Sequence, residues 1–170
     1  MKFAVIGAGA WGTAFAVHLA RVGHDVGLAP RRAEQAQALM TDGENREYLP
    51  GVSLPKSITI TADLRSASQD VDVIMLACPA QALRPTSERL REAMPSNHRN
   101  VVVISLVKGL ELGTHLRPSE VIAEILPHVV VGSLTGPTNA KEVAQGQPSA
   151  MLLATAPAQL FAREAQLAIS

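Results

Sequence analysis

Three glycines near the start of the chain, Gly7, Gly9 and Gly12, have the spacing of a GxGxxG turn. They directly follow the apolar run KFAVI, and a helical pattern begins within them. In such a strand–turn–helix unit the glycines permit a tight turn, a close approach of backbone to a pyrophosphate, and close helix–strand packing. The phosphates bind to the unpaired N–H groups at the positive end of the helix. The pattern predicts a dinucleotide site; a tight turn without a ligand is the plainer alternative.

The end of the predicted second strand bears on which dinucleotide is bound. An NAD-selective site usually has an acidic residue about 20 positions after the turn, where it holds the ribose 2′-OH. Here the strand ends VGLAPRR, so Arg31 and Arg32 stand in place of an acid. Guanidinium groups make strong charge-assisted hydrogen bonds to phosphate. The two arginines therefore favour NADP over NAD, although Arg31 stacked on the adenine would suit either cofactor.

Lys108 follows NVVVISL, a run typical of a buried strand. It should therefore lie at the carboxyl edge of the sheet, where open α/β folds bind their ligands. A loop lysine is usually only solvated, but this position predicts contact with a phosphate or polarisation of a substrate carbonyl.

A second loop, GPTNAKEV, also follows an apolar run. Asn139 and Glu142 have the spacing of a capping box, which predicts that a helix begins here. Helix N-termini attract anions, so this loop is a second candidate for phosphate binding. An ordinary helix cap is the alternative.

Short apolar runs alternate with helical patterns along the chain. Several runs lack polar alternation, as expected for strands covered on both faces. Strand alternating with helix predicts a parallel sheet with right-handed crossovers, and hence a Rossmann-type, doubly wound, mainly parallel α/β domain. The expected strands are KFAVI, HDVGLA, SITIT, VDVIMLA, NVVVISL and HVVVGSL, and the expected helices span residues 10–22, 31–40, 81–93 and 118–126.

The first helix carries a stripe of small and apolar residues at Gly12, Ala16 and Leu19. This narrow face predicts that the helix lies close on the sheet. Gly23 is expected to end the helix, because glycine readily takes the left-handed conformation found there. His18 falls on another side and is expected to face solvent.

Residues 156–170 read as a helix whose apolar face still needs a partner. No capping glycine or following proline closes the pattern. We expect residues 1–170 to form one domain of a two-domain protein, with the second domain absent from this chain.

Composition excludes several classes of protein. Of the 170 residues, 47% are apolar and 18% are charged, and the net charge is zero, as in ordinary globular domains. This argues against a nucleic-acid surface, which needs basic patches, and no apolar run is long enough to span a membrane. The single Cys78 suits a reducing cytoplasm. The spacing of His, Cys and acidic residues predicts no metal site.

Four segments occur in an order that resembles the NAD(P)-dependent glycerol-3-phosphate dehydrogenases: GAGAWGTAFA, NREYLPGVSLP, LVKGLE and GPTNAKEV. The resemblance covers the whole chain and implies a cofactor-binding domain, followed in the family by a helical substrate domain. It implies reversible hydride transfer between NAD(P)H and dihydroxyacetone phosphate, giving sn-glycerol 3-phosphate, in a homodimeric cytoplasmic enzyme. The family's general-base lysine would lie beyond Ser170, so no catalytic residue is expected within this chain.

The resemblance also implies roles for single residues. Ala10, Trp11, Arg31 and Ala140 would contact the cofactor. Lys108 would reach both the cofactor and the small phosphate substrate. The remaining substrate contacts would come from Gly136 and Thr138. The chain departs from the family pattern at Ala10, where serine is common.

Two other functions fit parts of the sequence. A reductase of the 6-phosphogluconate or ketopantoate reductase type shares the glycine turn, but it should lack NREYLPG and GPT-x-A-KE. A stand-alone dinucleotide-sensing module would not need Lys108 at the sheet edge. It would also typically carry an acidic residue at the end of the second strand.

Overall fold

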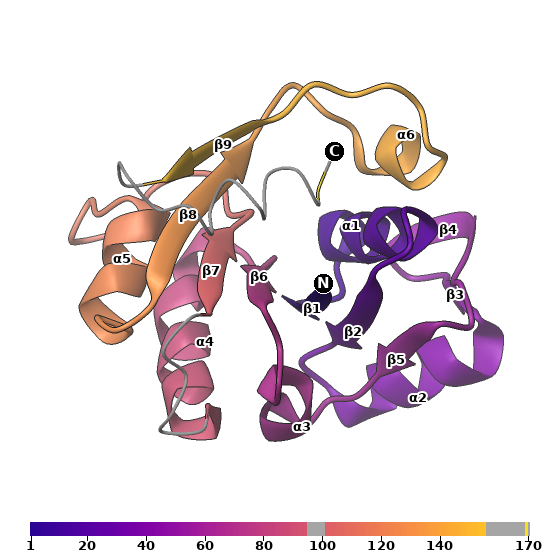
Figure 1. Cartoon of the computed structure of the whole chain (residues 1–170), viewed down its shortest axis with the longest axis horizontal. Helices are drawn as coiled ribbons and strands as arrows, with labels where there is room; N and C mark the ends of the chain where they lie inside the picture. Colours follow the sequence, from indigo (N-terminus) through magenta and orange to yellow (C-terminus); the bar gives the residue numbers. More distant parts are fainter. Residues whose placement is uncertain (95–100, 156–168, 170) are drawn as a thin grey trace.

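A computed structural model describes residues 1–94, 101–155 and 169, and its centre is a seven-stranded sheet (Figure 1). The strand order is β5-β2-β1-β6-β7-β8-β9, and every pair is parallel except β8–β9. This confirms the predicted doubly wound, mainly parallel sheet. The strands are β1 (Lys2–Ile6), β2 (Asp25–Ala29), β5 (Ile58–Ile60), β6 (Val73–Leu76), β7 (Val102–Ser105), β8 (Val130–Thr135) and β9 (Leu152–Thr155).

Helices cover both faces of the sheet. Helices α1 (Ala10–Arg21), α2 (Ala33–Asp42) and α6 (Ala140–Ala144) contribute to the apolar cluster on one face. Helices α3 (Leu64–Ser68), α4 (Ala80–Ala93) and α5 (Pro118–Ile125) contribute to the cluster on the other. Figure 1 shows α1 beside α6, and α4 beside α5, in agreement with their packing contacts.

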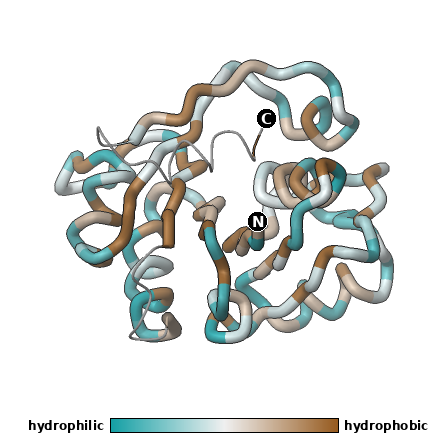
Figure 2. Tube along the Cα trace, in the orientation of Figure 1, coloured by the Kyte–Doolittle hydropathy of each residue, from teal (hydrophilic) through white to brown (hydrophobic). Residues whose placement is uncertain are grey.

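The central strands supply both clusters, because successive side chains of a strand point to opposite faces. In β1, Phe3 and Val5 enter the first cluster, whereas Ala4 and Ile6 enter the second. Figure 2 accordingly shows the centre of the sheet in the brown of hydrophobic residues. Strands buried on both faces explain the unbroken apolar runs in the sequence.

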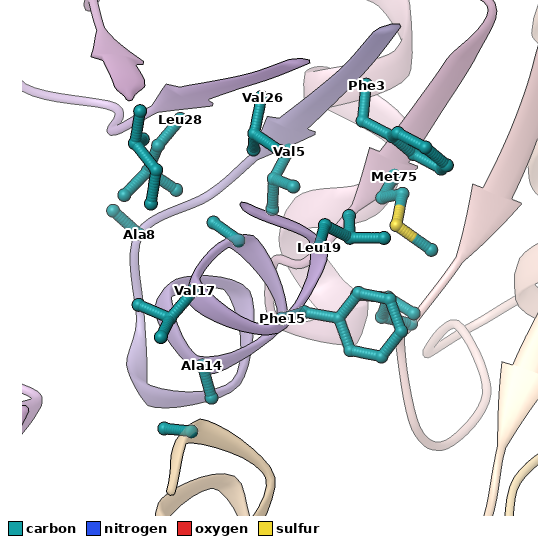
Figure 3. Close-up of a cluster of buried hydrophobic side chains, with 14 of the residues drawn as sticks. Phe3, Val5, Ala8, Ala14, Phe15, Val17, Leu19, Val26, Leu28 and Met75 are labelled. Atoms are coloured by element: carbon teal, nitrogen blue, oxygen red, sulfur yellow. The ribbon is translucent and has the colours of Figure 1, made fainter. Parts of the chain in front are cut away.

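Helix α1 packs closely on the sheet, as its stripe of small residues predicts. Phe15 and Leu19 lie against Phe3 and Met75 in the first cluster (Figure 3). Val17, outside the predicted stripe, is buried as well, and α6 packs on α1. The helix is therefore enclosed between the sheet and α6.

The end of α1 bears out one prediction and overturns another. Gly23 has a φ of +90°, and the N–H of His24 donates to the Leu19 carbonyl at 3.0 Å, so the glycine ends the helix as predicted. The prediction that His18 faces solvent is wrong. His18 is half-buried, and its Nε2 lies 2.9 Å from the carbonyl oxygen of Ile169.

Residues 43–55 are not among the strands expected from the sequence. They contain an antiparallel hairpin of β3 (Glu44–Asn45) and β4 (Leu49–Ser53). Residues 31–40 also differ slightly from the prediction, since Arg32 is extended and caps the helix that begins at Ala33. The helix predicted within residues 156–170 lies outside the described residues, apart from Ile169.

Candidate functional site

The carboxyl ends of the parallel strands meet at one edge of the sheet. Because β1 lies between β2 and β6, the chain reverses its winding direction there, and this switch point is where open α/β sheets bind ligands. Arg31 follows β2, the glycine turn follows β1, Lys108 follows β7 and Gly136 follows β8. From β2 to β7 is three strand spacings, about 14 Å. The predicted site residues thus form a row along this edge.

Two glycines of the turn are required by packing. Gly7 has a φ of +109°, and its N–H donates to the Ala29 carbonyl at 2.8 Å. A Cβ on Gly7 would collide with the Ala77 carbonyl, and a Cβ on Gly12 would collide with the Gly7 carbonyl. Because Gly7 and Gly12 have no side chain, the start of α1 lies close to the ends of β1 and β6, as the motif predicts.

The middle glycine has a different environment. Gly9 caps α1 in an extended conformation (φ −75°, ψ −175°), and a Cβ placed there would meet nothing within 4 Å. The first turn of α1 contains no acidic side chain that would neutralise the positive end of the helix. Backbone N–H groups beside open space at a positive helix end fit a pyrophosphate.

A cleft of about 370 Å³ opens beside Gly9 and runs between the end of β2 and the start of α4. Its walls are mainly apolar, with Pro30, Leu64 and Pro79 among them, which suits a flat ring. Of the predicted site residues, the cleft brings together Gly7, Gly9, Arg31 and Arg32. Those it does not include are Ala10, Trp11, Gly12, Lys108, Gly136, Thr138 and Ala140.

Three arginines line this cleft. Arg31 is exposed and makes no ion pair within the described part of the chain. Arg32 is paired with Glu47, with 3.1 Å between its Nη2 and the Glu47 Oε2. Arg89 reaches the cleft from α4. No sequence pattern indicates Arg89 or Glu47, because Arg89 is brought to the cleft by α4 and Glu47 is brought to Arg32 by the fold of the hairpin.

Tyr48 also lines the cleft, at the far end of the hairpin turn. Its pKa is raised, chiefly by a hydrogen bond to Glu47 and by that carboxylate's negative charge. The single O–H of the phenol is the donor of that hydrogen bond, so Tyr48 is tied to Glu47 at the edge of the cleft.

Asn45 fastens the hairpin to the glycine turn. This residue is only 2% exposed, and its Nδ2 donates to the Ala8 carbonyl at 3.0 Å and to Thr13 Oγ1 at 2.7 Å. Gln35 donates to the same Ala8 carbonyl at 2.9 Å. No local sequence pattern indicates this role of Asn45, because its partners precede it by more than thirty residues.

The loop that carries Lys108 is held by α4. The Gln81 side chain donates to the Leu110 carbonyl at 3.1 Å and accepts from the Leu112 N–H at 3.0 Å. Arg84 donates twice to the Glu111 carboxylate, at 2.8 and 3.0 Å. The Arg84 guanidinium holds the pKa of Glu111 below its ordinary value. The loop backbone is therefore fixed, while Lys108 itself is exposed.

The last segment of the row is the β8–α6 loop. The N–H of Thr138 donates to the Gly136 carbonyl at 2.9 Å, and Asn139 Oδ1 accepts from the Lys141 N–H at 2.9 Å. Asn139 therefore caps the helix that begins at Ala140, as its sequence position predicts. This helix packs on α1, whose first turn carries the half-buried Trp11.

Trp11 and Cys78 occupy partly buried positions near the glycine turn. The Trp11 ring lies 5.6 Å from that of Phe15, measured between centroids, so it packs on the first cluster. Cys78 lines the cleft, and burial raises the pKa of its thiol, which keeps it protonated and unreactive.

The described residues contain neither a helix that could span a membrane nor a cluster of metal ligands. None of the helices found within residues 1–94 and 101–155 is long and apolar enough to cross a membrane. In the same part of the chain, no group of three or more His, Cys, Asp or Glu side chains is arranged to hold a metal ion.

Comparison with known proteins gives a consistent result. The family model described as the NAD-dependent glycerol-3-phosphate dehydrogenase N-terminus matches residues 2–161. A glycerol-3-phosphate dehydrogenase [NAD(P)+] from Corynebacterium glutamicum is 40% identical over 156 residues, which is 91% of this chain and 46% of the relative. The corresponding protein from Moorella thermoacetica is 45% identical over 156 residues, covering 91% of this chain and 45% of that protein.

A solved structure agrees with the sequence relatives. The crystal structure of glycerol-3-phosphate dehydrogenase from Coxiella burnetii superimposes with a TM-score of 0.90 at 29% identity. The match covers 99% of this chain and 50% of that one. The chain thus spans about half the length of the curated relatives it matches.

Proposed function

This chain belongs to the NAD-dependent glycerol-3-phosphate dehydrogenase family, and we propose that it is the cofactor-binding half of such an enzyme. The proposed reaction is reversible hydride transfer between a nicotinamide cofactor and dihydroxyacetone phosphate, giving sn-glycerol 3-phosphate. The observation that carries the proposal is the row of site residues at the switch point. It runs from Arg31 through the glycine turn to Lys108 and Gly136.

At the glycine turn, the proposed ligand is the pyrophosphate of NADP or NAD. Gly9 leaves room for it, and the N–H groups of Ala10, Trp11 and Gly12 belong to the positive end of α1. The apolar cleft would take the adenine, with Arg31 beside the ribose 2′ position. The lack of an acid at the end of β2 supports NADP as the favoured cofactor.

At the other end of the row, we propose that Lys108 contacts both cofactor and substrate. The bound nicotinamide supplies or accepts the hydride. The Lys108 ammonium would attract the substrate phosphate or stabilise negative charge developing on the C2 oxygen. Gly136 and Thr138 would complete the substrate contacts, and Ala140 would touch the cofactor.

The remaining parts of the proposal concern the whole enzyme. We propose that a helical substrate domain beyond Ser170 supplies the general-base lysine, as the chain's coverage of about half of each relative supports. We also propose a homodimer in the cytoplasm, with no nucleic-acid partner. The family match favours this function over a 6-phosphogluconate or ketopantoate reductase type.

Binding and turnover measured on the same chain test the proposal. We expect the 170-residue chain to bind NADPH and NADH, measured by quenching of Trp11 fluorescence or by calorimetry. We expect no oxidation of NADPH when dihydroxyacetone phosphate is added, because the base is proposed to lie elsewhere. Absence of binding at millimolar dinucleotide would contradict the cofactor site. Measurable turnover would show that the base lies within this chain.

A further inference from the structure

The ion pair at the mouth of the cleft involves one of the two arginines that favour NADP. Arg32 Nη2 lies 3.1 Å from Glu47 Oε2 and 3.4 Å from Glu47 Oε1, so both carboxylate oxygens face it. The Arg32 side chain is 49% exposed and that of Glu47 is 55% exposed. Arg32 lines the cleft, whereas Glu47 stands outside it. Arg32 therefore lines the cleft and at the same time pairs with a carboxylate that does not line it.

Glu47 is brought to this place by an anchored segment. Asn45, two residues earlier, is bonded to Ala8 and Thr13 of the glycine turn. The N–H of Tyr48, the next residue, donates to the Asn45 side chain at 3.2 Å. Glu47 thus lies between Asn45, which is tied to the glycine turn, and Tyr48, whose backbone is tied to Asn45.

The pairing leaves the arginines at the cleft with unequal roles. Arg31 makes no ion pair among the described residues, so its full charge would be available to an anion bound in the cleft. The charge of Arg32 is offset by Glu47. A 2′-phosphate at this end of the cleft would meet one uncompensated guanidinium, one compensated guanidinium and a nearby carboxylate. A 2′-hydroxyl carries no charge and would not be repelled by that carboxylate.

We propose that Glu47 is a specificity-determining residue that reduces the preference of this site for NADPH, so that NADH is also accepted. The inference rests on the proposed cofactor site. In it, Arg31 attracts the 2′-phosphate while Glu47 opposes it, both directly and by neutralising Arg32. Removing the Glu47 charge should then strengthen NADPH binding selectively.

The test compares dissociation constants of NADPH and NADH for wild type and Glu47→Gln. Glutamine keeps the size of the side chain and can still accept a hydrogen bond from Arg32, so only the charge is lost. We expect NADPH to bind about three- to fivefold more tightly, the range set by an exposed ion pair, with NADH unchanged. The gain should shrink as ionic strength rises.

Glu34→Gln is the matched control, because Glu34 is exposed in the first turn of α2 and outside the cleft. It makes the same change in net charge, and both dissociation constants should stay at their wild-type values. A double variant, Glu47→Gln with Arg32→Gln, should return the NADPH affinity to that of wild type. Thermal unfolding of each variant verifies that the fold is kept.

Three results would overturn the inference. One is an unchanged NADPH affinity in Glu47→Gln while wild type binds both dinucleotides. Another is an equal gain for NADPH and NADH, or an equal gain in Glu34→Gln, which would indicate a general charge effect. Failure of wild type to bind either dinucleotide would overturn the proposed cofactor site, and this inference with it.

Discussion

At the scale of single residues, the three glycines of the turn have separate tasks. Gly7 and Gly12 are needed by the fold, since any side chain would strike Ala77 or the turn itself. Gly9 has open space around its Cα. The lack of a side chain at Gly9 is therefore not required by packing within the chain and matters only for a group that approaches from outside.

Alanine substitutions should separate these tasks. In Gly9→Ala the methyl group fits the folded chain but enters the space proposed for pyrophosphate, so we expect an unchanged melting temperature and at least about tenfold weaker dinucleotide binding. In Gly12→Ala we expect a loss of about 1–3 kcal/mol in the free energy of unfolding, because the methyl group overpacks the helix contact. Urea denaturation and calorimetric titration measure the two effects. Equal loss of stability in both variants would contradict the distinction.

Arg31 gives a second prediction at this scale. We expect Arg31→Ala to weaken NADPH by about 1.5–3 kcal/mol and NADH by less, because only NADPH carries a charged group at the ribose 2′ position. Arg91→Ala, which removes a similar charge from an exposed position on α4 outside the cleft, should affect neither dinucleotide. Equal losses for NADPH and NADH would instead support stacking of Arg31 on the adenine.

The site residues predicted from the sequence belong to one local motif, whereas those that were missed depend on contacts between separate segments. The glycine turn acts within one strand–helix unit, so six consecutive residues contain the whole signal. The pairing of Arg32 with Glu47 depends on how a hairpin folds back over the glycine turn. Arg89 reaches the cleft only because α4 packs beside β6 and begins at the same sheet edge. No local pattern records either relationship.

At the scale of elements, the hairpin β3–β4 supports the glycine turn through Asn45. We expect Asn45→Ala to lower the free energy of unfolding by about 1–3 kcal/mol, because it removes two buried hydrogen bonds and leaves Thr13 Oγ1 with one partner fewer. Gln37→Ala, on the exposed face of α2, should change stability by less than about 0.5 kcal/mol. Denaturation in urea measures both. A loss in Asn45→Ala no larger than in the control would show that the hairpin does not support the turn.

The Arg84–Glu111 pair gives the Lys108 loop a dependence on pH. In the folded chain the pKa of Glu111 is lowered by its hydrogen bonds to Arg84. The ionised Glu111 therefore stabilises the fold at pH values above the unfolded pKa of about 4.3, and this stabilisation is lost as the pH falls through the lower folded-state pKa. We expect Glu111→Gln to lower the melting temperature at pH 7 by a few degrees, with the difference from wild type shrinking under acid conditions. Glu88→Gln, on the exposed face of α4, is the control. A difference that stayed constant with pH would exclude the ion pair as its source.

The elements predicted from sequence are those with a strong internal period. Buried strands β1, β6 and β7 and the long helices α1 and α4 follow from apolar runs and helical spacing. The missed elements are short: β3 has two residues, and α3 has five. Such segments contain too few residues for a period, and tertiary contacts decide their conformation. The antiparallel strand β9 was also missed, because its orientation depends on pairing with β8.

At the scale of the whole molecule, the strand order follows from general rules once the elements are known. Right-handed crossovers on each side of β1 place the two sets of helices on opposite faces, and a switch point results. The sequence therefore predicted the edge at which the site lies. It did not predict the width of the cleft or its charges, because these depend on which loops fold over that edge.

The two ends of the row of site residues pack against different apolar clusters of the core. The glycine turn is backed by α1, in the first cluster, whereas the Lys108 loop is clamped by α4, in the second. Adjacent residues of β1, such as Val5 and Ile6, belong to different clusters. A substitution in that strand can therefore weaken the packing behind the glycine turn without affecting the packing behind the Lys108 loop, or the reverse, depending on which of two adjacent positions is changed. The packing behind the glycine turn and the packing behind the Lys108 loop can therefore change largely independently of each other.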